Sequence, residues 1–341
     1  MSTSMIAAVT LGHGGPDQIE IRDDWSRPEP GPGQALVRVR AAAVNNTDLW
    51  SREGRYGTAS DPDAISGWKG EPLTFPRIQG LDIAGDVVGV GDGVGEHWVG
   101  RCALVDPIAR YDGDFPVDII GSELDGGFAE FHVCSAAQLV DVSTSPLSAV
   151  ELACLPTAYG TALGMINRAQ CRTGERVLVT GSSGGVGSAA MQLLAERGCR
   201  VVALTSPSKE DLVRGGGAHE VVVRGVDDLS QVAPVDCVVD VVGGDDFGAL
   251  VDRLRVGGRL VTAGAIAGPV VQLDMRRLYL QQRRIIGSTM HTPSDFRELA
   301  RVANDGALQP TVAETFPLAE IHAAQRRFTE KDFVGKLVLE P

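Results

Sequence analysis

The sequence predicts an α/β protein of two domains, and three observations carry that prediction. Its 341 residues exceed the size at which a single hydrophobic core usually stops growing. Residues 1–145 contain short apolar segments separated by turns, whereas residues 146–288 alternate strand patterns with helix patterns. A glycine-rich turn at 181–187 joins a strand to a helix in the second region. We expect a barrel-like β unit and a doubly wound parallel sheet.

The first region has the alternation of half-buried strands. We expect strands at 35–44, 83–91, 101–105 and 126–134, with a turn-forming stretch at 28–33. Residues 289–341 carry helix patterns at 294–305 and 318–329 and a strand at 334–339. We expect this tail to return to the first domain. The predicted domains are therefore 1–145 with 289–341, and 146–288.

The second region has nearly continuous Val, Leu and Ile runs, which are typical of parallel strands buried on both faces. Strands are expected at 176–180, 200–204, 219–223, 236–242 and 258–264, and helices at 186–197, 208–215 and 246–255. Glycines follow two of these strands at the carboxyl edge, where such sheets bind ligands. They could also serve only as tight turns.

The turn after the first of these strands predicts a phosphate site. Glycine lets backbone approach a pyrophosphate, and the following helix N-terminus offers free N–H groups. Ser182 replaces the first glycine of a Gly-x-Gly-x-x-Gly motif, and a plain turn is the alternative. The residues expected to hold the phosphates are Gly181, Ser182, Ser183, Gly184, Gly185, Val186 and Gly187.

The end of the second strand predicts NADPH rather than NADH. NAD sites usually place Asp or Glu there to bond the ribose. This chain instead has Thr205, Ser206, Ser208 and Lys209, whose hydroxyls and ammonium suit a 2′-phosphate. The serines could also cap the helix that follows.

Composition narrows the possible partners. A formal net charge of −13 argues against a nucleic-acid partner and leaves a small-molecule substrate. Six cysteines contain no Cys-x-x-Cys pair, so we expect reduced thiols rather than a disulfide framework or a zinc ribbon. No signal peptide or membrane span is recognisable, which predicts a cytoplasmic protein.

The chain resembles the medium-chain dehydrogenase/reductase superfamily, and within it the zinc-independent, quinone oxidoreductase-like branch. The segments that carry the resemblance are 30–33, 44–48, 80–87, 126–130, 181–187, 240–244, 257–261 and 335–339. The resemblance implies a GroES-like β-barrel catalytic domain plus a Rossmann nucleotide-binding domain, with the active site in the cleft between them.

The resemblance also locates the metal ligands of zinc members. Their cysteine, histidine, glutamate and second cysteine correspond to Asn45, Leu81, Asp82 and Thr157. Zn²⁺ prefers thiolate and imidazole ligands. The lobe between 103 and 133 also lacks the cysteines of a structural zinc site. We therefore expect no zinc.

Without a metal to polarise a carbonyl, conjugated acceptors are the easier substrates. The resemblance implies that residues 45–56 line the pocket. We expect Asn45 and Tyr56 to donate to substrate and Thr47 to relay a proton, and we place Asp48, Trp50 and Thr157 in the pocket. Trp50 could instead be a core aromatic and Asp48 a turn or buried hydrogen-bonding residue.

On the cofactor side, the resemblance places further residues. Thr161 should lie by the nicotinamide, Val242 and Gly243 by the ribose, and Ala265 and Ile266 against the nicotinamide. Lys336 is expected near the cofactor, with a surface salt bridge as its alternative. Residues 278–286 lead to the sheet edge that pairs subunits in relatives, which implies a homodimer.

The predicted function is an NADPH-dependent reductase of quinones, enones or other activated double bonds. A metal-free carbonyl reductase or alcohol dehydrogenase, and a non-catalytic NADPH-binding protein, are the alternatives. The loop at 59–71 could cover the pocket and set specificity, or be a plain surface excursion.

Overall fold

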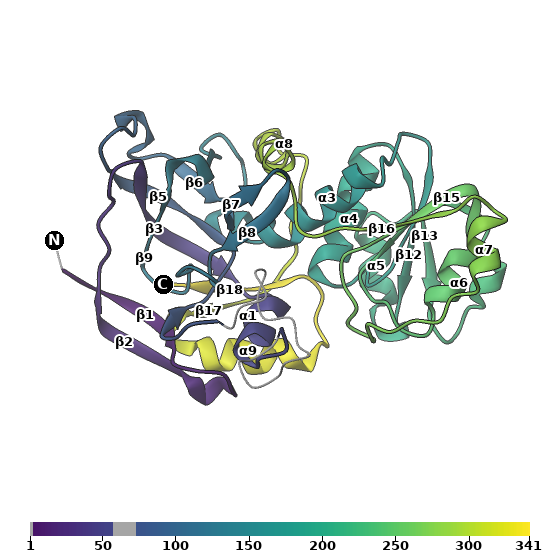
Figure 1. The fold of residues 1–341 in the computed structure, drawn as a ribbon, viewed down its shortest axis with the longest axis horizontal. Coiled ribbons are helices and arrows are strands. Elements are labelled where there is room, and N and C mark those ends of the chain that lie inside the picture. Colours follow the sequence, from purple (N-terminus) through teal and green to yellow (C-terminus); the bar gives the residue numbers. More distant parts are fainter. Residues whose placement is uncertain (1–2, 57–72) are drawn as a thin grey trace. The chain divides into compact units, whose positions relative to one another are not determined.

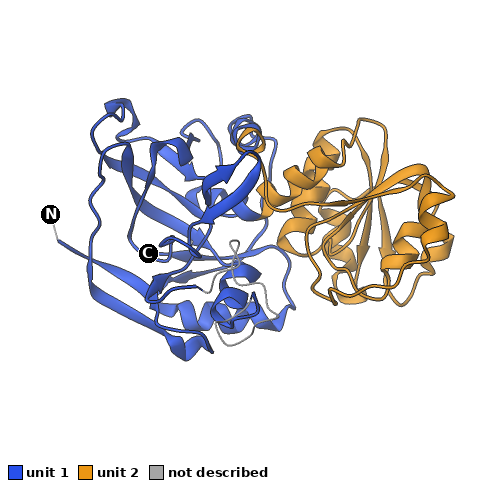
Figure 2. Cartoon of the chain, viewed as in Figure 1, with its two compact units in different colours: residues 1–157, 296–341 blue, residues 158–295 orange. Residues whose placement is uncertain are grey.

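The structure is a computed structural model, which describes residues 3–56 and 73–341. The chain divides into two compact units, residues 1–157 with 296–341 and residues 158–295 (Figure 2). The predicted loop at 59–71 lies outside the described residues. None of the described helices is long and apolar enough to cross a membrane.

Unit 1 is the β-rich unit (Figure 1). Its main sheet has the order β10-β6-β5-β3-β18-β17, with β9 also paired to β3, and β2-β1-β4 and β7-β8 form smaller sheets. Its strands are β1 (Ser4–Thr10), β2 (Ile19–Ser26), β3 (Gln34–Ala43), β4 (Arg77–Ile78), β5 (Ile83–Val90), β6 (Cys102–Val105), β7 (Ile108–Asp112), β8 (Phe115–Ile119), β9 (Phe131–Ser135), β10 (Leu139–Asp141), β17 (Val312–Pro317) and β18 (Lys336–Glu340). Its helices are α1 (Asn46–Arg52), α2 (Ala149–Ala153), α9 (Ile321–Glu330) and most of α8 (Pro293–Asn304), with short 3-10 turns at Pro16–Gln18, Glu96–Trp98, Ala136–Gln138 and Leu318–Glu320.

The carboxyl-terminal tail returns to this unit, as predicted. Strand β18 pairs antiparallel with β3, so that Val338 lies opposite Ala43. Strand β3 also shows the predicted alternation, because Arg38 and Arg40 are exposed while Val37 and Val39 are buried in the core. This pairing places Lys336 of β18 beside the segment that follows β3.

Unit 2 is a doubly wound parallel sheet with the order β13-β12-β11-β14-β15-β16. Counted within the unit, this is the order 3-2-1-4-5-6 of dinucleotide-binding domains. Its strands are β11 (Arg176–Val179), β12 (Arg200–Thr205), β13 (Glu220–Val223), β14 (Val235–Asp240), β15 (Leu254–Thr262) and β16 (Arg284–Gly287). Its helices are α3 (Gly160–Arg168), α4 (Gly185–Glu196), α5 (Glu210–Gly215), α6 (Phe247–Asp252) and α7 (Met275–Tyr279), with 3-10 turns at Pro207–Lys209 and Leu229–Gln231. The π-helical turn Leu155–Tyr159 spans the unit boundary.

Two predicted elements differ in the structure. The strand expected at 126–134 begins only at Phe131, because a Cβ on Gly126 would overlap the Gly80 carbonyl oxygen and this segment instead bonds the backbone at 78–80. The helix expected at 246–255 ends at Asp252, since β15 already begins at Leu254, opposite Val235.

The unit boundaries fall later than the predicted domain boundaries. Helix α2 follows the predicted boundary at 145/146 but packs on β3 and β5 of unit 1. Residues 289–291 follow the other predicted boundary, yet Arg168 of α3 donates a hydrogen bond to the Met290 carbonyl. These contacts keep α2 with unit 1 and residues 289–291 with unit 2.

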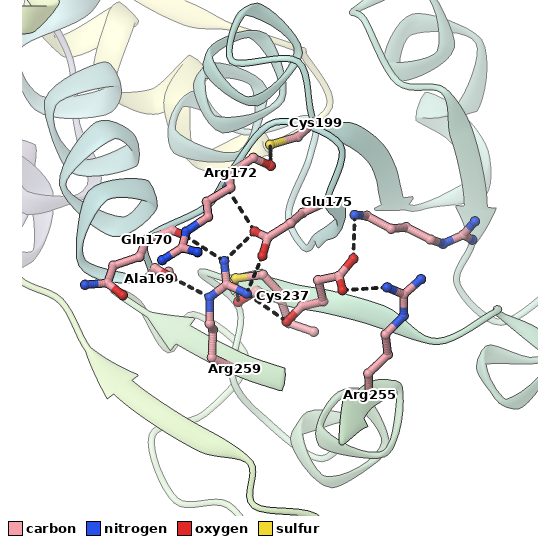
Figure 3. Close-up of polar contacts among 11 residues, drawn as sticks. Ala169, Gln170, Arg172, Glu175, Cys199, Cys237, Arg255 and Arg259 are labelled. Atoms are coloured by element: carbon pink, nitrogen blue, oxygen red, sulfur yellow. Dashed lines mark hydrogen bonds and ion pairs between the residues drawn. The ribbon is translucent and has the colours of Figure 1, made fainter. Parts of the chain in front are cut away.

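Arg259 ties the strands of unit 2 to the loop before β11. Figure 3 shows its guanidinium directed at Glu175, with the backbone of Ala169 and Gln170 beside it. Arg259 and Glu175 form an ion pair in which the Arg259 side chain is almost fully buried. On the neighbouring strand, Cys237 lies opposite Arg259. Arg259 thus satisfies carbonyl groups that would otherwise be buried without a partner.

Candidate functional site

Two of the predicted pocket residues, Asn45 and Thr157, meet Lys336 at the carboxylate of Asp82, which is fully buried. Its Oδ1 accepts a hydrogen bond from the backbone N–H of Thr157 at 2.7 Å. Its Oδ2 accepts from Asn45 Nδ2 at 2.9 Å and from Lys336 Nζ at 3.0 Å. Three residues that are far apart in the sequence are therefore held by one side chain.

Lys336 is buried in this cluster, with 6% of its surface exposed. Its ammonium forms an ion pair with Asp82 and donates a short hydrogen bond to Asn45 Oδ1. The alternative expectation of a surface salt bridge is wrong, because β18 pairs into the main sheet and directs Lys336 into the unit. Its predicted contact with the cofactor stays a prediction.

Asn45 precedes α1 and has every side-chain polar group engaged. Its Nδ2 donates to Asp82 and, over a longer 3.3 Å, to the Ala43 carbonyl, while its Oδ1 accepts from Lys336. Donation to a substrate, as the sequence predicts, requires exchange of one of these bonds. The bond to Ala43 is the longest and weakest of the three.

Asp48 lies in the first turn of α1 and is fully buried, as one of the alternatives for this residue predicts. Its Oδ2 accepts from the Asn45 backbone N–H at 2.7 Å, and its Oδ1 accepts from the Gly80 N–H at 3.2 Å. Burial, with the nearby Asp82 charge, raises the pKa of Asp48 to about 7, although these hydrogen bonds and Lys336 act in the opposite direction. A carboxyl that titrates near neutral pH thus lies within the cluster.

Thr47, Trp50 and Tyr56 form a second group, on α1 and just after it. All three are half-buried, and the Trp50 and Tyr56 rings meet edge to face with centroids 6.1 Å apart. Burial raises the pKa of the Tyr56 phenol, and a hydrogen bond with Thr47 partly offsets this effect. Trp50 also packs on the core of unit 1, as the alternative for this residue predicts, and its place in a substrate pocket stays a prediction.

The cluster does not have the chemistry of a zinc site. Leu81 is apolar and buried, Asn45 and Thr157 offer no thiolate or imidazole, and an ammonium already occupies Asp82. Within residues 3–56 and 73–341, no group of three or more His, Cys, Asp or Glu side chains could hold a metal ion. Thr157 keeps one unused group, since its buried Oγ1 has no hydrogen-bond partner among the described residues.

The glycine turn of unit 2 has the form of a phosphate cradle. Gly181 has φ +57°, which favours glycine, and a Cβ on Gly187 would overlap the Gly181 carbonyl oxygen. Helix α4 begins directly after Gly184. Ser182 donates its buried hydroxyl to the Leu204 carbonyl at 2.9 Å, so only its backbone is left for a ligand. The turn therefore fits a dinucleotide pyrophosphate.

The end of β12 also fits a phosphorylated ribose. Thr205 is buried and its Oγ1 lacks a partner among the described residues. Ser206 and Ser208 follow with their hydroxyl oxygens 3.3 Å apart, and Lys209 ends the same 3-10 turn. The structure thus brings the four predicted residues to one strand end, which carries no carboxylate from 205 to 209.

Two further turns of unit 2 carry predicted cofactor residues, and Asp240 organises one of them. Its fully buried carboxylate accepts hydrogen bonds from the backbone N–H groups of Val242 and Gly243 and from the Thr180 hydroxyl. This role of Asp240 was not predicted, although the segment 240–244, with an acid at a strand end before two glycines, is one of those that carry the resemblance.

The predicted cofactor residues on these turns lie as follows. Gly243 packs against Ala265, so the turns at 242–244 and 265–268 are neighbours. Ala265 and Ile266 are exposed. Thr161, on α3, is buried and its hydroxyl contacts the Met290 sulfur at 3.7 Å.

Comparisons with known proteins agree with this architecture. Residues 31–144 match the alcohol dehydrogenase GroES-like domain, and residues 185–305 match the zinc-binding dehydrogenase family. The acryloyl-coenzyme A reductase of Metallosphaera sedula is 30% identical over 98% of this chain and 99% of its own length. The quinone oxidoreductase of Sus scrofa is 28% identical over 98% of this chain and 97% of its own length.

A crystal structure gives a stronger likeness. A Sinorhizobium meliloti 1021 protein, provisionally described as an alcohol dehydrogenase, is 43% identical, with a TM-score of 0.93 over 100% of this chain and 98% of the other. The predicted α/β fold, a GroES-like unit with a Rossmann unit, is therefore confirmed.

Proposed function

Because the chain belongs to the medium-chain dehydrogenase/reductase superfamily and is quinone oxidoreductase-like, we propose that it is an NADPH-dependent, metal-free reductase of activated double bonds. Its substrates would be enones, enoyl thioesters or quinones. That it is an oxidoreductase with a nicotinamide cofactor follows from the family; the cofactor type, the substrate class and the absence of a metal are the proposal.

The hydrogen-bond donors around Asp82 are the observation that supports the proposed substrate class. The cluster offers amide, hydroxyl and ammonium groups, which are hydrogen-bond donors, and no set of metal ligands. Hydride attack on a conjugated double bond moves negative charge onto a distant oxygen, which such donors can stabilise. Reduction of an isolated ketone instead needs strong polarisation at the reacting carbon.

The cofactor would be held by the glycine turn and by the end of β12. The turn at 181–187 would bind the pyrophosphate, and Ser206, Ser208 and Lys209 would bind the 2′-phosphate. Thr161, Val242, Gly243, Ala265 and Ile266 would contact the nicotinamide and its ribose. When bound, NADPH supplies the hydride.

The chain's own residues would handle the oxygen and the proton. Asn45 would exchange its long bond to the Ala43 carbonyl for one to the substrate oxygen. Tyr56 would carry its proton at neutral pH, as an ordinary phenol does, burial raises its pKa further, and Thr47 would orient its hydroxyl. Tyr56 would donate that proton to the substrate carbon next to the carbonyl, after hydride has reached the far carbon, and Trp50 would provide a flat apolar wall.

The test is a side-by-side assay of NADPH and NADH oxidation with an enone, an enoyl thioester, a quinone, an aldehyde and a simple ketone. We expect turnover with the conjugated acceptors and NADPH, without added metal and unaffected by a chelator. Asn45→Ala and Tyr56→Phe should each lower kcat/KM at least about tenfold, while Asn46→Ala, whose side chain bonds exposed Lys331, serves as control.

Other outcomes distinguish the alternatives. Equal or better turnover of the simple ketone would favour a metal-free carbonyl reductase. Tight NADPH binding without turnover of any acceptor would favour a non-catalytic protein. Loss of activity to a chelator, with stoichiometric zinc in the purified protein, would reject the metal-free proposal.

We also propose a homodimer formed through β16. This strand is an edge of the unit 2 sheet, and apolar side chains are exposed on it and on the preceding segment: Met275, Tyr279, Leu280 and Ile285. An unprotected apolar edge favours pairing with a second copy. Light scattering should give twice the chain mass, and Ile285→Lys should give a monomer.

A further inference from the structure

Lys336 carries an inference that rests on the metal-free function proposed above and deepens it. We propose that Lys336 is the resident cation of this site: its ammonium supplies the fixed positive charge that a metal supplies in zinc-dependent members, and it positions Asn45 and Asp82. Lys336 thus acts through its two partners and is a positioning residue.

The contacts of the ammonium coincide with the positions that the resemblance assigns to metal ligands. Nζ bonds Asn45 Oδ1 and Asp82 Oδ2, which are two of those four positions. Asp82 Oδ1 holds the backbone of a third, Thr157, and the fourth is the buried Leu81. One ammonium therefore joins two of the three polar positions directly and the third through Asp82.

The charges around the ammonium support an electrostatic role. Asp82 and Asp48 are fully buried carboxylates of the same cluster, and the buried Cys154 thiol, directly after α2, interacts electrostatically with Lys336 and Asp82. An ammonium is unfavourable in a protein interior unless it is paired and hydrogen-bonded. Among these groups Lys336 is the one cation, so its removal would leave two carboxyl groups and one thiol.

The geometry explains what the cation positions. Asn45 turns its carbonyl oxygen to Lys336 and hence its Nδ2 away from it, toward Asp82 and Ala43. Lys336 thereby fixes the orientation of the Asn45 side-chain amide. Nδ2 of this amide is the group proposed to bond the substrate oxygen. A neutral side chain at 336 would release both Asn45 and Asp82.

Kinetics test the inference directly. Lys336→Met should lower kcat about 10- to 100-fold, a loss typical of misplaced catalytic groups, and should leave the KM for NADPH within about twofold. Lys336→Ala should regain activity with added methylammonium and not with tetramethylammonium, which has no N–H to donate. Lys331→Met removes a lysine over the Phe328 ring and should change neither constant.

Three kinetic results would overturn the inference. The first is unchanged kcat in Lys336→Met. The second is a raised KM for NADPH at unchanged kcat, which would make Lys336 a cofactor ligand. The third is a lost activity in folded Lys336→Ala that methylammonium does not restore.

A cobalt titration tests the inference even if no acceptor is reduced. The variant Asn45→Cys/Leu81→His/Thr157→Cys creates metal ligands beside Lys336, and the same variant with Lys336→Ala removes the ammonium. Since like charges in one site cost much binding energy, we expect Co²⁺ to bind the second variant at least about 100-fold more tightly.

Thiolate–cobalt absorption reports the binding, and thermal melts check that both variants fold. Equal cobalt affinity in the two folded variants would contradict the inference that the Lys336 ammonium lies at the positions of the metal ligands. A failed acceptor assay with the expected cobalt result would reject only the proposed function.

Discussion

The ammonium of Lys336 lies 3.0 Å from Oδ2 of Asp82, and their side chains are only 7% and 0% exposed. The carboxylate of this ion pair also accepts the Thr157 backbone N–H and the Asn45 amide. A buried pair adds little net stability over apolar residues, but removing one partner leaves an uncompensated charge. The stability of unit 1 should therefore be sensitive to the loss of either partner of this ion pair.

Asp82→Ala should destabilise unit 1 by about 3–5 kcal/mol, because it strands the Lys336 ammonium and the Thr157 N–H. Urea unfolding followed by Trp fluorescence measures this change. Asp86→Ala is the matched control, since this residue pairs with the exposed Arg38 and Arg40 and should cost at most about 1 kcal/mol. Equal effects would show that the Asp82 network contributes no special stability.

Asp48 should make the stability of the protein depend on pH. Its folded pKa, raised to about 7, lies above the unfolded value of about 3.9. The folded state therefore holds a proton that the unfolded state has released, so this contribution is present below about pH 4 and is lost as pH rises to about 7.

Thermal melts of wild type and Asp48→Asn from pH 5 to 8 measure this effect. Wild type should lose stability relative to the variant, by at most about 1.4 kcal/mol per pH unit, and the difference should level off above about pH 7. A constant difference across this range would mean that Asp48 does not titrate there.

Lys209→Ala should reduce the preference for NADPH over NADH about tenfold or more, since a hydrogen bond between charged groups contributes about 1.5–3 kcal/mol. The ratio of kcat/KM for the two cofactors is the measurement. Arg200→Ala, at the exposed start of the same strand, removes a charge at the other strand end and should leave the ratio unchanged. A higher kcat/KM for NADH in wild type would reject NADPH as the cofactor.

Gly187→Ala should abolish NADPH binding, because its Cβ would overlap the Gly181 carbonyl and displace the turn. Gly215→Ala, at the end of α5 and outside the turn, adds a Cβ that meets nothing within 4 Å. We expect the second variant to bind with nearly wild-type Kd in a fluorescence titration. Normal binding by both variants would contradict the assignment of the turn as a phosphate cradle.

Arg259→Leu should lower the stability of unit 2 by about 3 kcal/mol, because it leaves Glu175 and backbone carbonyls without their partner (Figure 3). Arg255→Leu also removes an arginine ion pair, with Asp236, but that arginine is exposed and the cost should stay below about 1 kcal/mol. Urea unfolding of unit 2, followed by circular dichroism, compares them. A larger cost for Arg255→Leu would contradict this ranking.

Local patterns predicted most of unit 2, but not α3, α7 or the edge strand β16. Apolar strand runs, helix periods and the glycine turn are short-range features, and each remains at its expected place within a few residues. The main exception is the start of β15 at Leu254, which depends on pairing with Val235. Residues 126–130 were also misassigned, because their backbone packs against the turn at 78–80.

The sequence by itself determined the fold, the glycine turn between β11 and α4, and the chemical types of the residues predicted for the pocket. Only the tertiary structure decided that Lys336 pairs with Asp82 and turns the Asn45 amide. The physical reason is that these interactions join residues up to 291 positions apart. A buried charge finds its partner through strand pairing and burial, neither of which is written in the local sequence.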